Sequence, residues 1–384
     1  MKIVIAPQGF KGSLTALEIA RAIETGIKRA MPDAETVLVP VADGGDGTLQ
    51  ALVDSSGGRI VTSTVTGPLG RLVQAQWGAM GDGVTAVIEM ARASGLALIK
   101  REERDPLHAT TRGTGELVKT ALDAGLRRFI VGIGGSATND GGAGLAQSLG
   151  ARLLDKSGKD LEPGGAALAH LDRIDVSKMD PRLKESKFTV ACDVNNPLCG
   201  ATGASAIFGP QKGATPEMVK QLDAALGHLA DVIRRDIGAN VKDRPGAGAA
   251  GGLGAGLMAF VDAELRAGVD IMLEAVGLEK LLPGTDLVIT GEGQIDRSTV
   301  FNKAPVGVAM LAKKRGIPVF ALAGSLGDGY QQVHQHGIDA VFSLVNGPMS
   351  LDDAMARTSD LISAQAEEIA RAVLTATLIK RPSR

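Results

Sequence analysis

The chain has 384 residues, a formal net charge of −2, and 3% aromatic residues. This length suits two domains of about 150 residues each, and the near-neutral charge offers no basic field for nucleic acid. No run of about 18 apolar residues is present, so we expect no membrane span. The opening residues, MKIVIAP, predict a strand rather than a signal sequence.

Cysteine and glycine usage narrows the class of protein further. The seven-residue spacing of Cys192 and Cys199, without partner ligands nearby, excludes a CxxC metal site. We expect reduced thiols and a cytoplasmic location. The 51 glycines cluster in loops and lack the collagen period. We therefore expect many places where another group comes close to the backbone, as in an enzyme that holds phosphates with its main chain.

Residues 1–58 alternate strand and helix, which is typical of the start of a parallel α/β sheet. Ser13 is the expected N-cap of the first helix. The expected elements and loops are the strand Ile3–Ala6, the loop Pro7–Ser13, the helix Leu14–Ala30, the strand Thr36–Val41, the loop Ala42–Thr48 and the helix Leu49–Ser55.

From Arg59 the pattern changes to short β-rich pieces separated by glycine turns, which favours antiparallel hairpins. A domain boundary is therefore expected near residue 60. Residues 161–186 carry little signal and predict surface loops, whereas residues 246–256 predict a close-packed loop and helix start, or else a linker. The other expected elements are helix 113–125, strand Phe129–Val131, a helix around Leu145–Leu149, strand Phe188–Cys192, and helix Thr215–Ile237 capped by Thr215.

After residue 280 the chain returns to alternating strands and helices. The expected elements are the strands Thr285–Thr290, Val319–Ala323 and Ala340–Leu344 and one closing helix, Asp352–Leu378. A parallel sheet needs cover on both faces, and neither chain end alone supplies enough strands. The fold class is therefore α/β with two α/β domains: a discontinuous one of residues 1–58 plus 280–384, built from both chain ends, and an inserted mixed-sheet domain of residues 59–279.

The central stretch, residues 129–150, combines a buried strand, a glycine-rich turn and a helix start. Glycine lets the backbone approach a ligand closely, and unpaired N–H groups at a helix start favour a phosphate. A tight turn that serves only packing is the alternative. The candidate phosphate-binding residues are Gly134, Gly135, Ser136, Thr138, Asn139 and Asp140.

Four charged residues stand where predicted strands end, namely Lys11, Asp43, Asp193 and Glu292. Ligands of open α/β sheets bind outside the carboxyl ends of strands. Phosphoryl transfer needs a cation clamp, carboxylates for Mg²⁺, glycine N–H groups and a proton acceptor, and the chain offers all of these. It lacks the GxxxxGK[ST] loop and the GxSxG elbow. Each residue also has a plainer interpretation, as a helix cap, an Asx-turn or a solvated lysine.

Six motifs, in order along residues 3–325, resemble those of the type I glycerate kinase family. They are FKGSL at 10–14, VADGG at 41–45, GIGGSATNDGG at 132–142, CDVNNPL at 192–198, FGPQKGA at 208–214 and TGEG at 290–293. The resemblance implies ATP-dependent, Mg²⁺-assisted phosphorylation of D-glycerate to 2-phosphoglycerate. It also implies two α/β domains, one of them flavodoxin-like, with the site between them and closed against water during turnover.

On this resemblance we assign site residues as hypotheses. Asp193 accepts the proton of the glycerate 2-hydroxyl, Lys11 neutralises the phosphoryl group, and Asp43 with Glu292 or Asp296 positions Mg²⁺. The substrate-binding candidates are Ser13, Asn195, Lys212 and Lys303, and Arg92, Lys212 and Lys303 are all eligible for the substrate carboxylate. The chain departs from the family pattern at Gln8, Ser298 and Asn302.

Two other functions stay open at this point. One is a kinase of another small hydroxy acid, or glycerate 3-phosphorylation, because the position of the phosphorylated hydroxyl depends on small displacements that no motif shows. The other is a non-catalytic sensor that binds a phosphorylated metabolite. We expect a small-molecule substrate and no nucleic acid or membrane partner, and a homodimer stays open.

Overall fold

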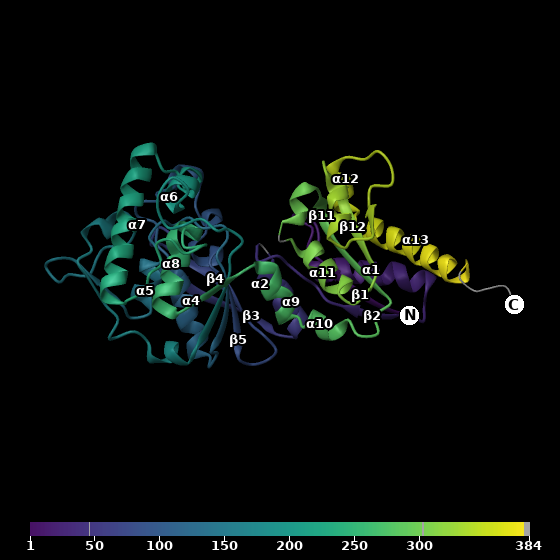
Figure 1. Cartoon of the computed structure of the whole chain (residues 1–384), viewed down its shortest axis with the longest axis horizontal. Helices are drawn as coiled ribbons and strands as arrows, with labels where there is room; N and C mark the ends of the chain where they lie inside the picture. Colours follow the sequence, from purple (N-terminus) through teal and green to yellow (C-terminus); the bar gives the residue numbers. More distant parts are fainter. Residues whose placement is uncertain (46, 302, 380–384) are drawn as a thin grey trace. The chain divides into compact units, whose positions relative to one another are not determined.

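The computed structural model describes residues 1–45, 47–301 and 303–379, which belong to two compact units (Figure 1). Unit 1 comprises residues 1–43 and 272–384, and unit 2 comprises residues 44–271. The predicted fold class is confirmed: both units are α/β, and the first is built from both chain ends. No helix among the described residues combines the length and the apolar character needed to cross a bilayer.

The bounds of the units differ from those expected from the sequence. Residues 44–58 lie in unit 2 because α2 (Thr48–Ser56) packs on β4 (Leu72–Ala79) and β5 (Thr85–Glu89). The contact is close: a methyl group added to Gly78 of β4 would lie 2.5 Å from the Val53 side chain. Residues 272–279 lie in unit 1, because α9 (Gly268–Ala275) passes from one unit into the other.

The sheet of unit 1 has five parallel strands in the order β13-β12-β11-β1-β2. Counted within the unit, this order reads 5-4-3-1-2, which is the flavodoxin-like order. The pairing of β1 with β11 brings Val4 beside Val288 although the two lie in opposite parts of the chain. The strands are β1 (Lys2–Pro7), β2 (Glu35–Leu38), β11 (Leu287–Ile295), β12 (Val319–Leu326) and β13 (Ala340–Ser343).

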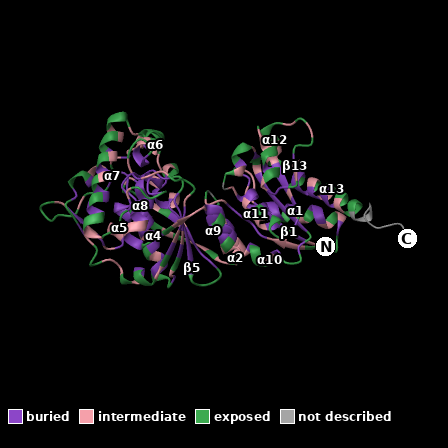
Figure 2. Ribbon diagram, viewed as in Figure 1, coloured by how far each residue is buried: buried purple, intermediate pink, exposed green. Residues whose placement is uncertain are grey.

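Helices cover both faces of this sheet, as a parallel sheet requires. Ile3 and Ile5 of β1 share a core with α1 and α13, whereas α11 packs on β1, β11 and β12. Figure 2 shows the strands buried between helices whose outer faces are exposed. The helices of unit 1 are α1 (Ala16–Ala30), α10 (Leu278–Leu281), η6 (Arg297–Val300), α11 (Ala304–Lys313), η7 (Tyr330–His336), α12 (Leu351–Ala356) and α13 (Thr358–Ile379), where η denotes a 3₁₀ helix.

Two details of unit 1 correct the sequence analysis. The N-cap of α1 is Thr15, not Ser13, because Thr15 and Glu18 form a reciprocal capping box. The closing helix is two helices, because the backbone of Arg357, with a φ of −103° and a ψ of 10°, leaves the helical conformation between α12 and α13. The capping pattern S/T-x-x-E was readable at residues 15–18, but the break near residue 357 has no glycine or proline to mark it.

The sheet of unit 2 is mixed, in the order β10-β9-β6-β5-β4-β3. The antiparallel pieces predicted after residue 59 are confirmed for β3 and β4 and for β4 and β5. From β5 onward the sheet is parallel, with Glu89 beside Gly132 and Gly132 beside Ala191. The remaining strands are β3 (Arg59–Thr66), β6 (Arg128–Gly132), β9 (Lys187–Ala191), β10 (Glu264–Arg266) and a separate pair, β7 (Arg152–Leu154) and β8 (Arg173–Asp175).

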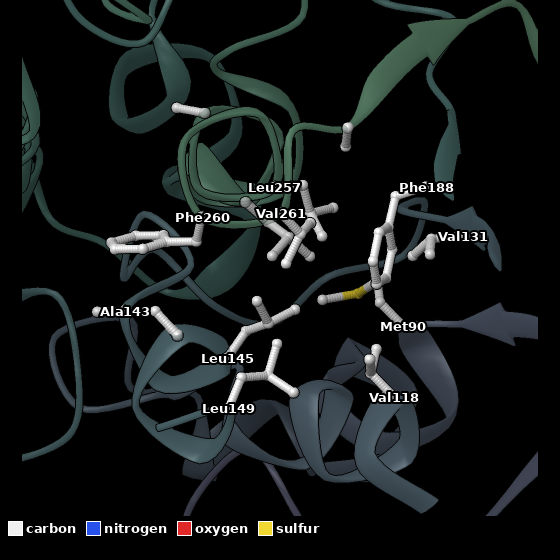
Figure 3. Packing of buried hydrophobic residues seen from close by; sticks show 14 of the residues in the cluster. Met90, Val118, Val131, Ala143, Leu145, Leu149, Phe188, Leu257, Phe260 and Val261 are labelled. Carbon is white, nitrogen blue, oxygen red and sulfur yellow. The ribbon is translucent and has the colours of Figure 1, made fainter. Parts of the chain in front are cut away.

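The core of unit 2 lies between this sheet and its helices (Figure 3). Phe129 and Phe188, on neighbouring strands, stack with ring centroids 4.4 Å apart, and Leu145 and Leu257 reach the same core from α5 and α8. The helices are α3 (Ala91–Ser94), η1 (Leu96–Leu98), η2 (Arg101–Glu103), α4 (Arg112–Asp123), α5 (Ala143–Ser148), η3 (Ala166–His170), η4 (Pro181–Glu185), α6 (Ala204–Phe208), η5 (Pro210–Lys212), α7 (Pro216–Asp236) and α8 (Ala249–Val261).

The two segments without a clear sequence signal are both ordered. Residues 161–186, predicted as surface loops, contain β8 and two 3₁₀ helices, so that prediction is wrong in part. Residues 246–256 form the close-packed loop and helix start that we preferred over a linker. Within α8, Ala250, Gly251 and Gly252 all have positive φ angles. A methyl group on Gly251 would lie 1.9 Å from the Thr138 carbonyl oxygen, so only glycine fits there.

Candidate active site

In unit 1, the ligand-binding position is set by strand order. The chain leaves β1 towards β2 on one side, while β11 lies on the other, so the strand order reverses between β1 and β11. Ligands of such sheets bind at this switch point, outside the carboxyl ends of the strands. The residues that follow β1 and those at the end of β11 are therefore the candidates in this unit.

A tight turn after β1 presents Lys11. The Phe10 N–H donates to the Leu14 carbonyl at 2.9 Å, and between them Gly12 adopts a φ of +77°, a conformation that favours glycine. Lys11 is exposed at the tip of this turn. The Ser13 hydroxyl, by contrast, hydrogen bonds with Met355 and Thr358, so it fastens the turn to the α12–α13 junction.

Glu292 forms a buried cluster within β11, because this strand runs on to Ile295 rather than ending at Thr290 as expected. Its side chain accepts a hydrogen bond of 2.5 Å from the Thr299 hydroxyl and one of 3.5 Å from Lys303 Nζ. Burial raises the pKa of Glu292, opposed by Thr299 and Lys303, and the nearby Asp43 carboxylate also raises the pKa. The structure therefore pairs Lys303 with Glu292, and the charge of Asp43, from a distant part of the sequence, acts on the same carboxyl group.

Asp296 is engaged differently. It is the N-cap of η6, and its Oδ1 atom accepts hydrogen bonds from the N–H and the hydroxyl of Ser298, at 2.7 and 2.6 Å. These bonds lower the pKa of Asp296. Ser298, a departure from the family pattern, thus acts on Asp296. Asn302, a second departure, and Asp46 lie outside the described residues.

The carboxylates of unit 1 fit one kind of metal site only. Within the described residues, no three His, Cys, Asp or Glu side chains gather closely enough to hold a metal ion by themselves. Asp43 and Glu292 both carry hard oxygen donors, and the charge of Asp43 acts on Glu292. Mg²⁺ commonly takes one or two carboxylates and completes its shell with water and substrate phosphates. This donor set fits Mg²⁺ in that manner, and not an ion held entirely by protein.

In unit 2, a glycine turn follows β6. Gly134 and Gly135 are exposed, Gly135 has a φ of +71°, and a methyl group on Gly134 would meet nothing within 4 Å. The N–H groups of these two glycines make no hydrogen bond within the described part of the chain. Successive free N–H groups in a turn form an anion-binding concavity. The turn thus has the open backbone predicted for phosphate binding.

The rest of the glycine loop is buried. The side chains of Thr138, Asn139 and Asp140 are 0% exposed, and Ser136 is 7% exposed. Asp140 accepts hydrogen bonds from the N–H groups of Thr111, Gly142 and Gly144 and from the Thr111 hydroxyl. Burial raises the pKa of Asp140, and these donors oppose that effect. The exposed residues of the loop, which a ligand can contact in this structure, are Gly134 and Gly135.

Lys212 also lies inside unit 2. Its side chain is 1% exposed, and Nζ donates a hydrogen bond of 2.6 Å to the Thr138 carbonyl. Burial lowers the pKa of Lys212 to about 7, and the Asp140 charge acts in the opposite direction. The FGPQKG motif therefore places its lysine beneath the glycine loop, out of reach of a substrate in solution.

Asp193 follows β9 and is exposed at the same sheet edge. Its Oδ1 atom accepts a hydrogen bond of 3.0 Å from the Gly268 N–H. A methyl group on Gly44 would lie 2.9 Å from Gly268 Cα and 3.7 Å from Asp193 Oδ2. Gly44 is therefore required for the VADGG loop to pass beside Asp193. Asn195 is exposed two residues further on.

Sequence reasoning missed one acidic residue at this edge. Glu89 ends β5, is 8% exposed, and accepts hydrogen bonds from the Leu49 N–H at 3.0 Å and from Arg92 Nε at 2.9 Å. The signal that marks Glu89 is the same one that marked Asp193, an acidic residue directly after an apolar run. The sequence predicted an antiparallel strand here, so the position of Glu89 at the end of a parallel strand is known only from the pairing of β5 with β6.

The comparisons with known proteins cover nearly the whole chain. The family model described as "Glycerate kinase family" matches residues 3–374. This chain belongs to the glycerate kinase family. The protein named "Glycerate kinase" of Bacillus subtilis (strain 168) is 55% identical over 373 residues, 97% of this chain and 98% of that protein. The "Glycerate 2-kinase" of Escherichia coli (strain K12) is 54% identical over 370 residues, 96% of this chain and 97% of that protein.

The structural likeness within the glycerate kinase family is equally extensive. The "putative glycerate kinase 2" of Salmonella typhimurium LT2 has 51% sequence identity to this chain and a TM-score of 0.92. That comparison covers 98% of this chain and 99% of the other. The resemblance seen in the six sequence motifs is thereby confirmed as family membership, and the α/β fold as that of a glycerate kinase.

Proposed function

We propose that this protein transfers the γ-phosphoryl group of ATP to the 2-hydroxyl of D-glycerate and yields 2-phosphoglycerate and ADP. Family membership supports phosphoryl transfer, and the name of the Escherichia coli relative supports the 2-position. The observation that carries the proposal is the exposed Asp193 carboxylate in the same unit as the open Gly134–Gly135 turn.

Asp193 is the proposed proton acceptor. As the hydroxyl oxygen of glycerate forms its bond to phosphorus, the bond between phosphorus and ADP breaks, and the hydroxyl proton moves to the carboxylate. The Gly268 N–H holds Oδ1 at 3.0 Å and so orients the group. The unpaired N–H groups of Gly134 and Gly135, with Ser136, bind the phosphates.

Lys11 is the proposed cation for the transferring phosphoryl group, and its exposed position at the tip of the turn after β1 supports this role. Asp43 and Glu292 would hold Mg²⁺, with Asp296 reached through water. When bound, Mg²⁺ neutralises phosphate charge during transfer. Asn195 and Lys303 are proposed to contact the substrate.

Five predicted site residues are assigned a supporting role instead. Thr138, Asn139 and Asp140 are fully buried, and Lys212 is bonded to the loop from below. We propose that these residues fix the shape of the glycine loop rather than contact phosphate. Ser13, whose hydroxyl is bonded to α12 and α13, is proposed to hold the Lys11 turn.

The experiment follows ATP hydrolysis and product formation with and without D-glycerate. Turnover that requires D-glycerate supports the kinase, whereas binding without turnover supports a sensor. Proton-coupled ³¹P spectra of the product identify the phosphorylated carbon, because a phosphate on the single proton-bearing C2 gives a doublet and one on the C3 methylene gives a triplet. A triplet would overturn the 2-position, and faster turnover of another hydroxy acid would overturn the substrate.

Location and assembly are further proposals. A reducing cytoplasm suits Cys192 and Cys199, which are both free thiols. A homodimer is tested by light scattering of the purified chain, where twice the chain mass of 39.4 kDa is the expected result.

A further inference from the structure

Arg92 is the feature from which a new assignment follows. It lies in α3, directly after β5, at the sheet edge that carries Gly134 and Asp193. Its Nε atom donates to Glu89 Oε2 at 2.9 Å, and its side chain is 42% exposed. Nη1 lies 3.4 Å from Gln76 Oε1, and Nη2 makes no hydrogen bond within the described residues. The guanidinium group is thus held at one edge and open at another.

Glu89 is itself fixed. While Oε2 holds Arg92, Oε1 accepts the Leu49 N–H in the first turn of α2 at 3.0 Å. The N-cap of α2, Gly47, supplies no side-chain bond, so Glu89 serves as the cap from another element. One buried carboxylate therefore joins β5, α2 and Arg92, and limits the directions in which the guanidinium group can point.

The segment of Arg92 is also bonded to the glycine turn. The Leu96 N–H donates to the Gly135 carbonyl at 2.9 Å, and the Ala137 N–H donates to the Ser94 carbonyl at 3.0 Å. A methyl group on Gly135 would lie 3.3 Å from the Ala91 side chain. Residues 91–96 and 134–137 are therefore joined at three points, and Ala91, which precedes Arg92 in the chain, lies beside the open backbone of the turn.

The other two cations eligible for the substrate carboxylate offer fewer open donors than the guanidinium group of Arg92. Lys212 is 1% exposed and donates to the Thr138 carbonyl. Lys303 pairs with Glu292 at 3.5 Å. Arginine also suits a carboxylate better than lysine does, because its planar fork donates two parallel hydrogen bonds.

We propose that Arg92 binds the carboxylate of the acidic substrate, and that Glu89 is the positioning residue that orients it. The inference rests on the proposed function, since an acid-binding arginine is needed only if the substrate is an acid. Arg92 is then the group by which the enzyme selects hydroxy acids over uncharged polyols of the same shape. Discrimination arises because a substrate without the charge leaves the open edge of the Arg92 guanidinium group without a partner at the site.

The test compares the steady-state kinetics of Arg92→Gln, Arg92→Lys and Glu89→Gln with those of the wild type. For Arg92→Gln we expect the KM for D-glycerate to rise about 10- to 100-fold, the range of a lost charged hydrogen bond, with the KM for ATP within twofold. Arg92→Lys should recover part of the loss because it keeps the charge without the fork. Glu89→Gln, which keeps an acceptor for Leu49, should raise the same KM by a smaller factor.

A second substrate gives a readout that a merely structural role would not move. The wild type should prefer D-glycerate over its neutral amide, and Arg92→Gln should lower that preference by the same factor as it raises KM. Arg152→Gln is the matched control, because Arg152 is also 42% exposed and pairs with Asp160 at 2.9 Å on β7. Its kinetics should equal those of the wild type.

The outcomes separate the two proposals. A wild type that does not phosphorylate D-glycerate overturns the proposed function, and this assignment with it. A wild type that does so, together with an Arg92→Gln variant whose KM for D-glycerate stays within twofold, overturns the assignment alone. A variant in which the KM for ATP rises instead overturns it too, because Arg92 would then bind phosphate.

Discussion

Lys212 Nζ donates a hydrogen bond of 2.6 Å to the carbonyl oxygen of Thr138, at a position where the lysine side chain is 1% exposed. The lysine thus supports the glycine loop from within unit 2. A buried ammonium group is costly unless it is compensated, and the Asp140 charge compensates it in part. This relationship gives the stability of the protein a dependence on pH.

We predict that the free energy of unfolding rises between pH 7.5 and 9.5. Burial lowers the pKa of Lys212 to about 7 from its usual 10.5, so in this range the unfolded chain binds a proton that the folded protein lacks. Stability then increases with pH, by at most about 1.4 kcal/mol per pH unit. Asp140, whose pKa burial raises, acts in the opposite sense at lower pH, because its folded form keeps a proton longer than the unfolded chain.

Urea denaturation at the two pH values measures this effect. The double variant Lys212→Met/Asp140→Asn removes both buried titratable groups, so its free energy of unfolding should not rise over this pH range. Equal slopes in the wild type and the double variant would contradict a buried lysine that titrates near pH 7.

Asp193→Asn should keep the fold and lower kcat by at least about 10²-fold, the usual contribution of acid–base assistance. The amide keeps the shape of the side chain and an oxygen for the Gly268 N–H, but it cannot accept the proton. Steady-state kinetics and a thermal melt test this together. Asp231→Asn, on the exposed face of α7, is the control. Near-normal turnover of Asp193→Asn would show that the residue only forms the turn.

Lys11→Met should lower kcat far more than it lowers the thermal midpoint. Lys11 is exposed at the tip of its turn, so its removal leaves the core of unit 1 unchanged. Lys220→Met, an exposed lysine of α7, provides the comparison and should change neither quantity. If Lys11→Met melted early while the remaining folded enzyme kept its kcat, the side chain would serve packing instead.

Gly26→Ala should destabilise unit 1. In this structure the new methyl group would lie 2.1 Å from the Ser363 carbonyl oxygen, where α1 and α13 touch. We expect a loss of about 1–3 kcal/mol from overpacking, which exceeds the gain of about 1 kcal/mol in helix propensity. Gly227→Ala, inside α7, meets nothing closer than 3.8 Å and should stabilise. Calorimetry that shows the same sign for both variants would contradict this packing.

A fragment of residues 1–150 should lack a cooperative thermal transition. It contains β1 and β2 but none of β11, β12 and β13, which complete their sheet. Calorimetry and amide exchange measure this directly. A sharp transition with protected amides at residues 3–6 would refute the sheet that joins the two chain ends.

The sequence predicted most elements because their signals are local. Thr215 and Pro216 mark the start of α7, and apolar runs mark the strands. The sequence could not predict which residues of a motif are buried and which are exposed. Gly134 and Asp140 stand six residues apart in one glycine-rich stretch, yet one is exposed and the other fully buried. The difference arises from α8 and Lys212, which pack against Thr138 from more than 70 positions away.

Packing between distant parts of the chain also explains why the bounds of the two units differ from the expected ones. Residues 44–58 follow a strand of unit 1 and continue its alternating pattern, but α2 has its packing partners on β4 and β5. The sequence also contains no sign that β5 and β6 pair in parallel. A strand reads alike in the sequence whether it joins its neighbour through a hairpin or through a crossover. The candidate site residues at strand ends were found because an acidic residue after an apolar run is a local signal.

The pairing of β1 with β11 has a consequence for the newborn chain. On the ribosome, β1 and β2 emerge first, but their neighbour β11 begins only at residue 287. At 5–20 residues per second, the two early strands wait on the order of 10–50 s for that partner. All of unit 2 leaves the ribosome in the interval and can complete its own core. The first strands made are thus among the last to be buried, and this unpaired edge is where a holding chaperone has the most to protect.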